Sequence, residues 1–215
     1  MTVTIDEAAV RARVTVPLRF PDGYATSTEV FTFTGLADGR EHLALGLGDW
    51  RTALAGAAGP LVRPHSECLT GDVFGSTRCD CGPQLREAAE RISTAGGFLL
   101  YLRQEGRGIG LYAKLDAYAL QDAGLDTYEA NLALGHGEDE RDYTAAAQML
   151  RTLGVARIQL LSNNPDKAAQ LSSLGIEVTS QVRTGVHLSA ANQRYLAAKR
   201  DHTHHLLDLP FAGAA

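Results

Sequence analysis

From about residue 60 onward, the chain alternates short apolar runs with helical patterns, and this order constrains the fold more than any other feature. The runs FLLYLR, RIQLLS and IEVTSQV are typical of β-strands. The helical patterns around them stop at glycines, namely Gly96, Gly124, Gly154 and Gly175. A sheet with helices packed on it is the architecture that this order implies. The sequence therefore predicts an α/β (α+β) fold.

Apolar spacing and end signals predict the individual helices. Asn164 is a typical N-cap, and Pro165 suits the first position of the helix that follows it. Ser189 is a typical N-cap for a last helix, which would run through residues 195–202. The other predicted helices span residues 84–94, 111–123 and 143–153.

The first sixty residues instead alternate in the manner of strands. Val14, Val16 and Leu18 share one face, and the runs VFTFTG and LALGLG follow. The stretch AGAAGP indicates a loop or a weak boundary. We predict three parts of the chain, which are a β-rich segment at 1–58 packed on the main domain, the main domain itself at 59–207 and a tail at 208–215.

Composition and charge exclude several classes of function. The chain has 45% hydrophobic and 21% charged residues, as ordinary globular proteins have. Its net charge of −5 argues against binding to nucleic acid or to an anionic membrane, so an anionic ligand needs locally clustered Arg and Lys. No run of about 18 apolar residues is present. The N-terminus lacks the apolar core of a secretory signal, so we expect a cytoplasmic protein.

The three cysteines form a tight cluster in the sequence, with ten residues between Cys68 and Cys79 and one between Cys79 and Cys81. Their odd number argues against a disulfide framework. A catalytic zinc ion takes three protein ligands and leaves a fourth position for water, whose pKa it lowers to near neutrality. Taken alone, this spacing indicates metal ligands and buried core cysteines about equally. A site completed by His65 is a further alternative.

A glycine-rich turn, Arg103–Gly110, follows the run FLLYLR and precedes a predicted helix. Glycines let backbone N–H groups approach an anion, and a helix N-terminus adds a favourable dipole. Arg103 and Arg107 suit phosphate, although the glycine spacing is neither that of a dinucleotide fold nor that of a P-loop. By itself, the turn is a weak indication of a phosphate site.

Three further segments are ambiguous when taken singly. The acidic loop 137–143 is typical of a solvated charge run. Residues 162–167 stand at the end of a predicted strand, where α/β folds bind ligands, but they also suit a simple helix cap. The histidines at 202, 204 and 205 fit a solvated helix end better than a metal site.

Together these blocks resemble the GTP cyclohydrolase II family over about residues 60–200. The resemblance rests on RPHSECLTGDVFGSTRCDCGPQL, RQEGRGIGL, AYALQ, DTYEAN, DERDY and SNNPDK, in that order. It implies a mixed β-sheet flanked by helices, one zinc ion per chain and a homodimer. The implied enzyme opens the imidazole ring of GTP and releases formate and diphosphate. The implied product, 2,5-diamino-6-(5-phosphoribosylamino)pyrimidin-4(3H)-one, belongs to the first step of riboflavin biosynthesis.

The resemblance also assigns ligand-binding positions. Cys68, Cys79 and Cys81 match the zinc ligands of the family. The positions that match contacts to GTP are Arg63, Pro64, His65, Ser66, Glu67, Gln84, Glu105, Gly106, Arg107, Thr127, Ser162 and Lys167.

Three further positions match the catalytic set. Asp139 matches a proton acceptor, Arg141 a residue with a nucleophilic role at the α-phosphate, and Tyr118 a tyrosine beside the metal. A guanidinium stays protonated at neutral pH, so we expect Arg141 to stabilise charge on the α-phosphate, with Asp139 orienting it. Tyr118 lies one helical turn beyond Lys114, so both are expected to point into one pocket. Triphosphate hydrolysis also calls for Mg²⁺.

A few positions depart from the family pattern. Ser162 replaces the usual threonine and keeps the hydroxyl, whereas Asp116 and Tyr112 stand where an arginine and an aliphatic residue are common. The segment 136–138 replaces the usual lead into the acidic loop. One alternative is therefore a paralogue that stops at the formamidopyrimidine or at GMP plus diphosphate. The other is a non-catalytic module that binds zinc or a nucleotide.

Overall fold

The computed structural model describes residues 8–137, 139–189 and 191–192. The predicted last helix after Ser189, the three C-terminal histidines and the tail 208–215 lie outside these residues. The described part of the chain holds no helix with the length and apolar character that crossing a membrane requires.

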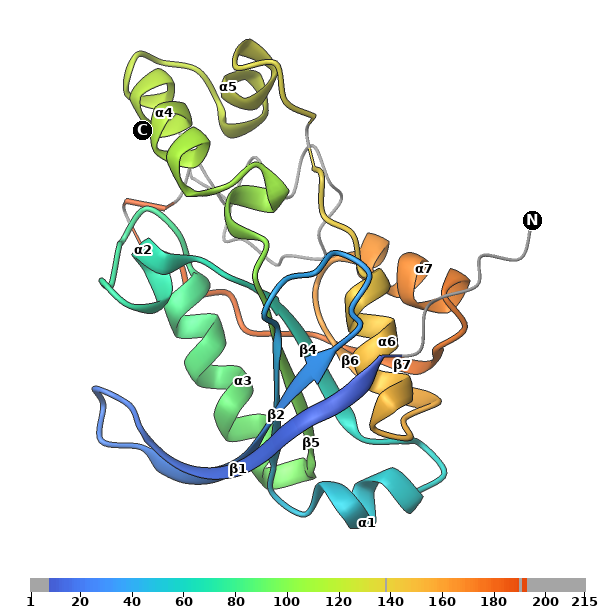
Figure 1. The fold of residues 1–215 in the computed structure, drawn as a ribbon. Coiled ribbons are helices and arrows are strands. Elements are labelled where there is room, and N and C mark those ends of the chain that lie inside the picture. Colours follow the sequence, from blue (N-terminus) through green and yellow to red (C-terminus); the bar gives the residue numbers. More distant parts are fainter. Residues whose placement is uncertain (1–7, 138, 190, 193–215) are drawn as a thin grey trace, which may run out of the picture.

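A seven-stranded mixed sheet forms the centre of the molecule, which confirms the predicted fold class (Figure 1). β1–β2, β2–β3 and β3–β5 are antiparallel pairs, whereas β5–β4, β4–β6 and β6–β7 are parallel. In sheet order the strands are β1 (Ala9–Arg19), β2 (Ala25–Thr34), β3 (Leu43–Leu47), β5 (Gly97–Leu102), β4 (Leu61–Ser66), β6 (Arg157–Leu161) and β7 (Glu177–Val182). The predicted boundary near residue 58 falls between strands of this one sheet, and the division into domains stays a prediction.

The helices predicted from periodicity are present, and shorter ones add to them. The longer helices are α3 (Cys81–Ala95), α4 (Leu111–Asp122), α6 (Thr144–Thr152) and α7 (Pro165–Ser173). Those without a predicted counterpart are α1 (Trp50–Ala55), α2 (Leu69–Asp72), the 3-10 turn η1 (Glu105–Gly108) and α5 (Thr127–Ala133).

The expectation that the first sixty residues form only strands and loops is wrong at α1. Asp49 caps this helix by accepting a hydrogen bond from the Thr52 backbone N–H at 3.2 Å. The Trp50 ring then packs against the rings of Phe31 and Phe98, which also contact each other. Partial burial of this large ring stabilises a helix that is too short to show a period of 3.6 residues.

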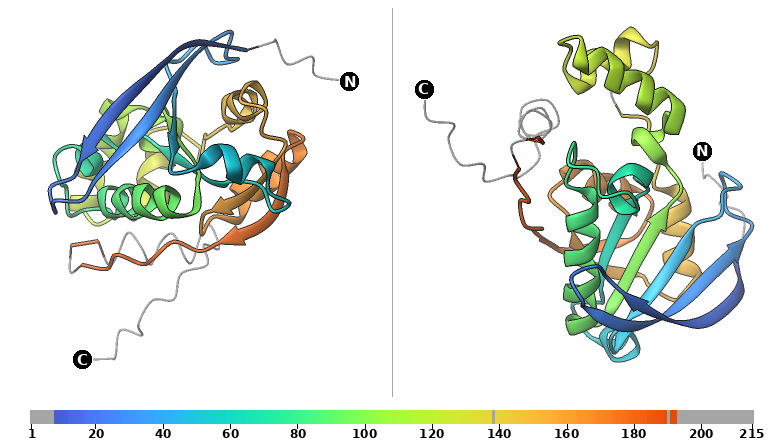
Figure 2. Two further views of the ribbon diagram at one scale, coloured as in Figure 1. Left: turned by 90° about the horizontal axis from the view of Figure 1, so that it is seen from below. Right: turned by 90° about the vertical axis from the view of Figure 1, so that its left-hand side faces the viewer.

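The two faces of the sheet carry separate hydrophobic clusters, because side chains alternate along each strand. On β5, Leu99 faces the cluster that contains Ile92 of α3. Phe98 and Leu100 face the larger cluster, which contains Leu150 of α6. Helix α3 therefore covers one face, while α6, α7 and α1 cover the other (Figure 2).

The parallel strands β4, β5 and β6 end at the same edge of the sheet. The loop to the second and third cysteines follows β4, the glycine-rich turn follows β5, and residues 162–164 follow β6. Helices α4 and α5 contact each other beyond this edge (Figure 1). Because ligands of open α/β sheets bind outside the carboxyl ends of the strands, this edge is the place to look for a site.

Candidate active site

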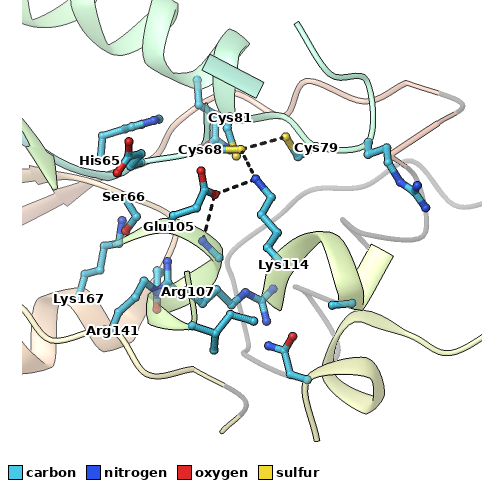
Figure 3. Close-up of a pocket in the computed structure, with 18 of the residues that line it drawn as sticks. His65, Ser66, Cys68, Cys79, Cys81, Glu105, Arg107, Lys114, Arg141 and Lys167 are labelled. Carbon is cyan, nitrogen blue, oxygen red and sulfur yellow. Dashed lines mark hydrogen bonds and ion pairs between the residues drawn. The ribbon is translucent and has the colours of Figure 1, made fainter. Parts of the chain in front are cut away.

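A single pocket at this edge brings together the blocks that lie far apart in the sequence. Of the predicted site residues, all but Pro64, Thr127 and Asp139 line it. The three cysteines lie at one end, the basic side chains of Arg107, Arg141 and Lys167 gather at the other, and Glu105 lies between them (Figure 3). Thr127 is the first residue of α5, and its side chain is not among those described.

The three cysteine sulfurs are arranged as metal ligands would be. Cys68 precedes α2, Cys79 lies in the following loop and Cys81 begins α3. Their sulfur atoms all lie within 4.8 Å of one another, and the Sγ atoms of Cys68 and Cys79 are 3.7 Å apart. Two sulfurs bound at about 2.3 Å to one tetrahedral ion lie about 3.8 Å apart. The thiolate set therefore fits zinc.

Gly71 makes this close approach sterically feasible. A Cβ atom at this position would lie 2.7 Å from the Cys79 sulfur and 3.1 Å from the Cys68 sulfur. The first distance is shorter than real Cβ contacts and the second is tighter than most of them, so a side chain here would displace the sulfurs. α2 thus serves as a tight turn under the three sulfurs.

Replacing Gly71 with alanine is expected to lower the bound zinc well below one ion per chain. The added methyl group overpacks the site at a cost of about 1–3 kcal/mol. Because the sulfurs are displaced to make room for it, their affinity for the metal ion falls. Metal content measured on the purified variant checks this. Gly137→Ala is the control, because its added Cβ meets Glu140 only at 3.4 Å and should leave the metal content unchanged. Full occupancy in Gly71→Ala would contradict the steric argument.

Without a metal ion, the thiol protons are shared unequally within the cluster. Hydrogen bonds from Cys79 and Cys81 hold the pKa of Cys68 far below its ordinary value, and Lys114 adds to the effect. Donation to Cys68 raises the pKa of the Cys79 thiol to about 11. Cys68 is therefore the thiolate that forms first.

Lys114 lies between this cluster and the rest of the pocket. Its Nζ donates to the Cys68 sulfur at 3.1 Å, to Thr70 Oγ1 at 3.0 Å and to Glu105 Oε1 at 2.8 Å. Burial alone would lower the pKa of Lys114, but the hydrogen bond to Glu105 and the charge of Cys68 raise it above its ordinary value. The side chain is thus an ammonium ion at neutral pH. Tyr118 lines the same pocket, which confirms the expectation that the two residues point into one space.

Glu105 anchors the segment that carries Cys68, the first of the three cysteines. Besides Lys114, its carboxylate accepts hydrogen bonds from the backbone N–H of Leu69 at 2.7 Å and of Gly106 at 3.1 Å. Both carboxylate oxygens thus have partners within the protein, and the predicted contact of Glu105 with GTP stays a prediction.

Asp72 lies behind the cysteines, and several side-chain and backbone groups form hydrogen bonds with its carboxylate. Its buried carboxylate lies 3.1 Å from His65 Nε2 and accepts from the Tyr101 hydroxyl at 2.9 Å and from the Cys68 backbone N–H at 3.0 Å. Burial lowers the pKa of His65, so the ring is neutral at pH 7. His65 therefore supports the loop through Asp72, and the one candidate metal cluster among the described residues consists of the three cysteines.

The basic end of the pocket is built by the glycine-rich turn and the acidic loop together. Gly106 and Arg107 have φ of 62° and 63°, and Arg107 is the one non-glycine residue with a positive φ in the described part of the chain. Strain of this kind is found mostly at functional sites. The Arg107 carbonyl accepts a hydrogen bond from the Glu140 N–H at 3.0 Å, which joins the two loops.

Asp139 holds Arg141 in the way that the sequence predicts. Arg141 Nε donates to Asp139 Oδ1 at 2.7 Å, and a second guanidinium nitrogen pairs with Oδ2. Burial opposes the charge of Asp139, but these bonds outweigh it and hold the pKa of the carboxyl below its ordinary value. Asp139 is thus an ionised carboxylate that orients Arg141, and Arg141 rather than Asp139 lines the pocket.

The end of β4 is tied to the elements around it by buried polar side chains. Arg63 donates to the Leu161 carbonyl at 3.1 Å and to Gln84 Oε1 at 2.7 Å. Lys167 Nζ donates to the carbonyl of Pro64 at 2.8 Å, which gives Pro64 a place in the site through its backbone. Ser162 Oγ accepts from the Asn164 N–H at 3.0 Å, so the hydroxyl kept at this position turns the chain into α7.

The structure adds pocket residues that the sequence analysis did not assign. Arg78 lies over the Tyr118 ring at 4.6 Å and forms an ion pair with Asp122 of α4. Its position next to Cys79 is the sequence signal that could have indicated it. Tyr112 and Asp116, which depart from the family pattern, are exposed on α4 and do not line the pocket.

Comparisons with known proteins agree with this geometry. The family model described as GTP cyclohydrolase II matches residues 12–183. GTP cyclohydrolase-2 of Vibrio cholerae serotype O1 is 50% identical over 202 residues, which cover 94% of this chain and 100% of that protein. GTP cyclohydrolase-2 of Vibrio vulnificus is 50% identical over 93% of this chain and 98% of that protein. Riboflavin biosynthesis protein RibBA of Bacillus subtilis is 49% identical over 89% of this chain and 48% of that longer protein.

Proposed function

The chain belongs to the GTP cyclohydrolase II family, and on this premise we propose that it opens the imidazole ring of GTP by hydrolysis and releases formate and diphosphate. The proposed product is 2,5-diamino-6-(5-phosphoribosylamino)pyrimidin-4(3H)-one, and the proposed place is the first step of riboflavin biosynthesis. One observation carries the proposal: a single pocket has three clustered thiolates at one end and basic side chains at the other. A purine ring and a triphosphate need this pair of environments.

The bond changes define what the pocket has to provide. Ring opening and formate release break the C8–N9 and C8–N7 bonds, and diphosphate release breaks the bond between the α-phosphorus and its bridging oxygen. Each of the three hydrolyses consumes one water. As C8 leaves in formate, N9 gains one proton and N7 gains two, which makes N7 the new amino group. Proton transfer is therefore needed near the purine, and charge stabilisation near the α-phosphate.

At the purine end, Cys68, Cys79 and Cys81 would hold zinc, which supplies Lewis-acid activation of water when bound. Tyr118 lines the pocket beside them. Burial raises the pKa of Tyr118, so its phenol keeps its proton at neutral pH and is the group we assign to donate a proton during ring opening.

At the phosphate end, Arg141 is oriented by Asp139, and Arg107 and Lys167 line the same part of the pocket. A guanidinium suits phosphate oxygens because its donors form a planar fork. We assign Arg141 to stabilise the charge that develops on the α-phosphate. Mg²⁺ is proposed to neutralise the β- and γ-phosphates as it enters with the triphosphate.

Incubation of the zinc-loaded protein with GTP labelled with ¹³C at C8 tests the function. We expect labelled formate and diphosphate in equal amounts, detected by NMR, and the diaminopyrimidinone by mass spectrometry. Chelation of zinc should remove formate formation, and omission of Mg²⁺ should slow diphosphate release. Turnover of GTP without formate would contradict the proposal and identify a paralogue that stops early. Binding of GTP without turnover would identify a non-catalytic module.

The family resemblance supports two finer proposals about the protein as a whole, which are a homodimer and a location in the cytoplasm. Sedimentation of the zinc-loaded protein at several concentrations tests the first of these. A single species with the mass of one chain would contradict it.

A further inference from the structure

A buried cation contacts one of the three thiolates. Lys114 lies on the inner face of α4, where it and Ala117 are the buried residues of that helix. Its Nζ is 3.1 Å from the Cys68 sulfur, and the close-up shows this contact next to the one with Glu105 (Figure 3). The side chain thus reaches from α4, beyond the edge of the sheet, into the cysteine cluster.

The three protons of the Lys114 ammonium all have acceptors within the protein. An ammonium donates three hydrogen bonds. Those of Lys114 go to the Cys68 sulfur, to Thr70 Oγ1 and to Glu105 Oε1, at 2.8 to 3.1 Å. A lysine that binds phosphate needs donors directed at the ligand, and this one has already committed its donors. Its role therefore concerns the sulfur ligand rather than the triphosphate.

The charge of the cluster gives this contact its importance. Three thiolates carry a charge of −3, so a divalent ion bound to them leaves a net charge of −1. Negative charge donated by the sulfurs reduces the ability of the ion to polarise water. A hydrogen bond from a cation to one thiolate withdraws part of that charge, as hydrogen bonds to ligand sulfurs do in other metal centres.

Glu105 and Leu69 keep this hydrogen bond in place. Glu105 Oε1 accepts from Lys114, while Oε2 accepts from the backbone N–H of Leu69, the residue next to Cys68. The ammonium and the thiolate are therefore held by one carboxylate, which fixes their separation. Among the described residues, the contact of this kind is made to Cys68, so the three ligands are not equivalent.

We propose that Lys114 is a positioning residue that acts through Cys68, by donating a hydrogen bond that lowers the charge which this thiolate gives to the metal. The inference rests on the zinc site of the proposed function. It assigns a role to a residue that the sequence analysis placed in the pocket without giving it a function. The consequence is a metal that stays a good Lewis acid despite three thiolate ligands.

Cobalt substitution tests the hydrogen bond without reference to turnover. Co²⁺ bound by thiolates shows charge-transfer absorption from sulfur to metal, and its energy falls when a hydrogen bond to sulfur is lost. We expect the absorption of Co²⁺-loaded Lys114→Met to move to longer wavelength than that of the wild type. With zinc, kcat for formate release should fall about 10- to 100-fold, as for other outer-sphere partners of metal ligands, while KM changes little.

Arg78→Met is the matched control, since it removes one positive charge from the same pocket. Arg78 pairs with Asp122 and lies over Tyr118, so its loss should leave the charge-transfer absorption in place. If Lys114→Met does not fold, Lys114→Gln replaces it, with a shift in the same direction expected because a neutral amide is a weaker donor. An unshifted spectrum in a folded, cobalt-loaded variant overturns the inference. Absence of charge-transfer absorption in the wild type would instead contradict the thiolate site of the proposed function.

Discussion

Replacing Cys79 with serine is expected to abolish formate release from GTP while the protein stays folded. The Sγ atoms of Cys68 and Cys79 are 3.7 Å apart, and loss of one thiolate leaves two protein ligands where a catalytic zinc site needs three. Loss of outer-sphere partners alone costs about 10- to 100-fold, so loss of a ligand should exceed a 100-fold decrease in formate production. Zinc content and formate, measured on the same sample, check the result.

Diphosphate release should respond differently in the same variant. The basic end of the pocket lies away from the cysteine sulfurs (Figure 3), and Arg141 is held there by its hydrogen bond to Asp139. We therefore expect Cys79→Ser with Mg²⁺ to release diphosphate from GTP at a reduced but measurable rate. The ratio of formate to diphosphate, for which we expect a value of one in the wild type, should fall towards zero.

Ser76→Ala is the control for Cys79→Ser, because it lies in the same loop and leaves the thiolates intact. Ser76 Oγ accepts only a long hydrogen bond, 3.3 Å, from the Arg78 N–H. Zinc content and formate production should therefore match those of the wild type. Formate production by zinc-free Cys79→Ser would show that ring opening proceeds without the metal, and would overturn the proposed division of the pocket.

Elements with a clear period or a clear end signal were predictable from the sequence. The alternation along the N-terminal strands and the continuous apolar run of β5 correspond to real strands, and Asn164 caps α7 as expected. α2 and η1 have four residues each, so neither completes enough turns to show a helical period. Tertiary contacts stabilise these short helices, such as the hydrogen bond from the Leu69 N–H to Glu105.

The cysteine cluster, which is the candidate metal site, shows how much the spacing of residues in the sequence can predict. Ten residues between two cysteines are compatible with many different distances between their sulfur atoms. In the structure, α2 brings the sulfurs of Cys68 and Cys79 together. The glycine at position 71 that permits this approach has no signal that distinguishes it from other glycines in the sequence. The sequence assigns no role to Asp72, whereas in the structure its four hydrogen-bond contacts come from β4, β5 and the Cys68 backbone.

The positions predicted to contact GTP come from the family resemblance, and the structure shows which of their polar atoms already have partners within the protein. Arg63 is buried and donates hydrogen bonds to Gln84 and to the Leu161 carbonyl. It therefore holds the elements around the pocket together in addition to lining it. Glu105 uses its carboxylate to anchor Lys114 and Leu69. Residue types predict that these side chains are polar and near a ligand, but only the packing decides which polar atoms are already satisfied.

Replacing Arg141 with glutamine is expected to lower the rate of diphosphate release by about 100- to 1,000-fold, the usual cost of losing one donor that stabilises charge in a transition state. The Arg141 side chain is 12% exposed and fixed by two contacts to Asp139, so its charge is preorganised at the pocket wall. Because the three thiolates do not contact this residue, zinc content should stay at one ion per chain. Phosphate products resolved by ion-exchange chromatography, together with zinc content, check both expectations.

Two further variants separate the charge of Arg141 from its attachment to Asp139. Asp139→Asn keeps the guanidinium but weakens its anchor, so diphosphate release should fall less than in Arg141→Gln. Arg157→Gln is the matched control, since Arg157 begins β6 at the opposite end of the strand and forms an exposed pair with Glu177. Exposed pairs contribute at most about 1 kcal/mol, so this variant should keep wild-type turnover and stability.

If Arg141→Gln released diphosphate as fast as Arg157→Gln, the charge at position 141 would have no part in the reaction at the α-phosphate. The role would then pass to Arg107 and Lys167, the other basic side chains that line this end of the pocket.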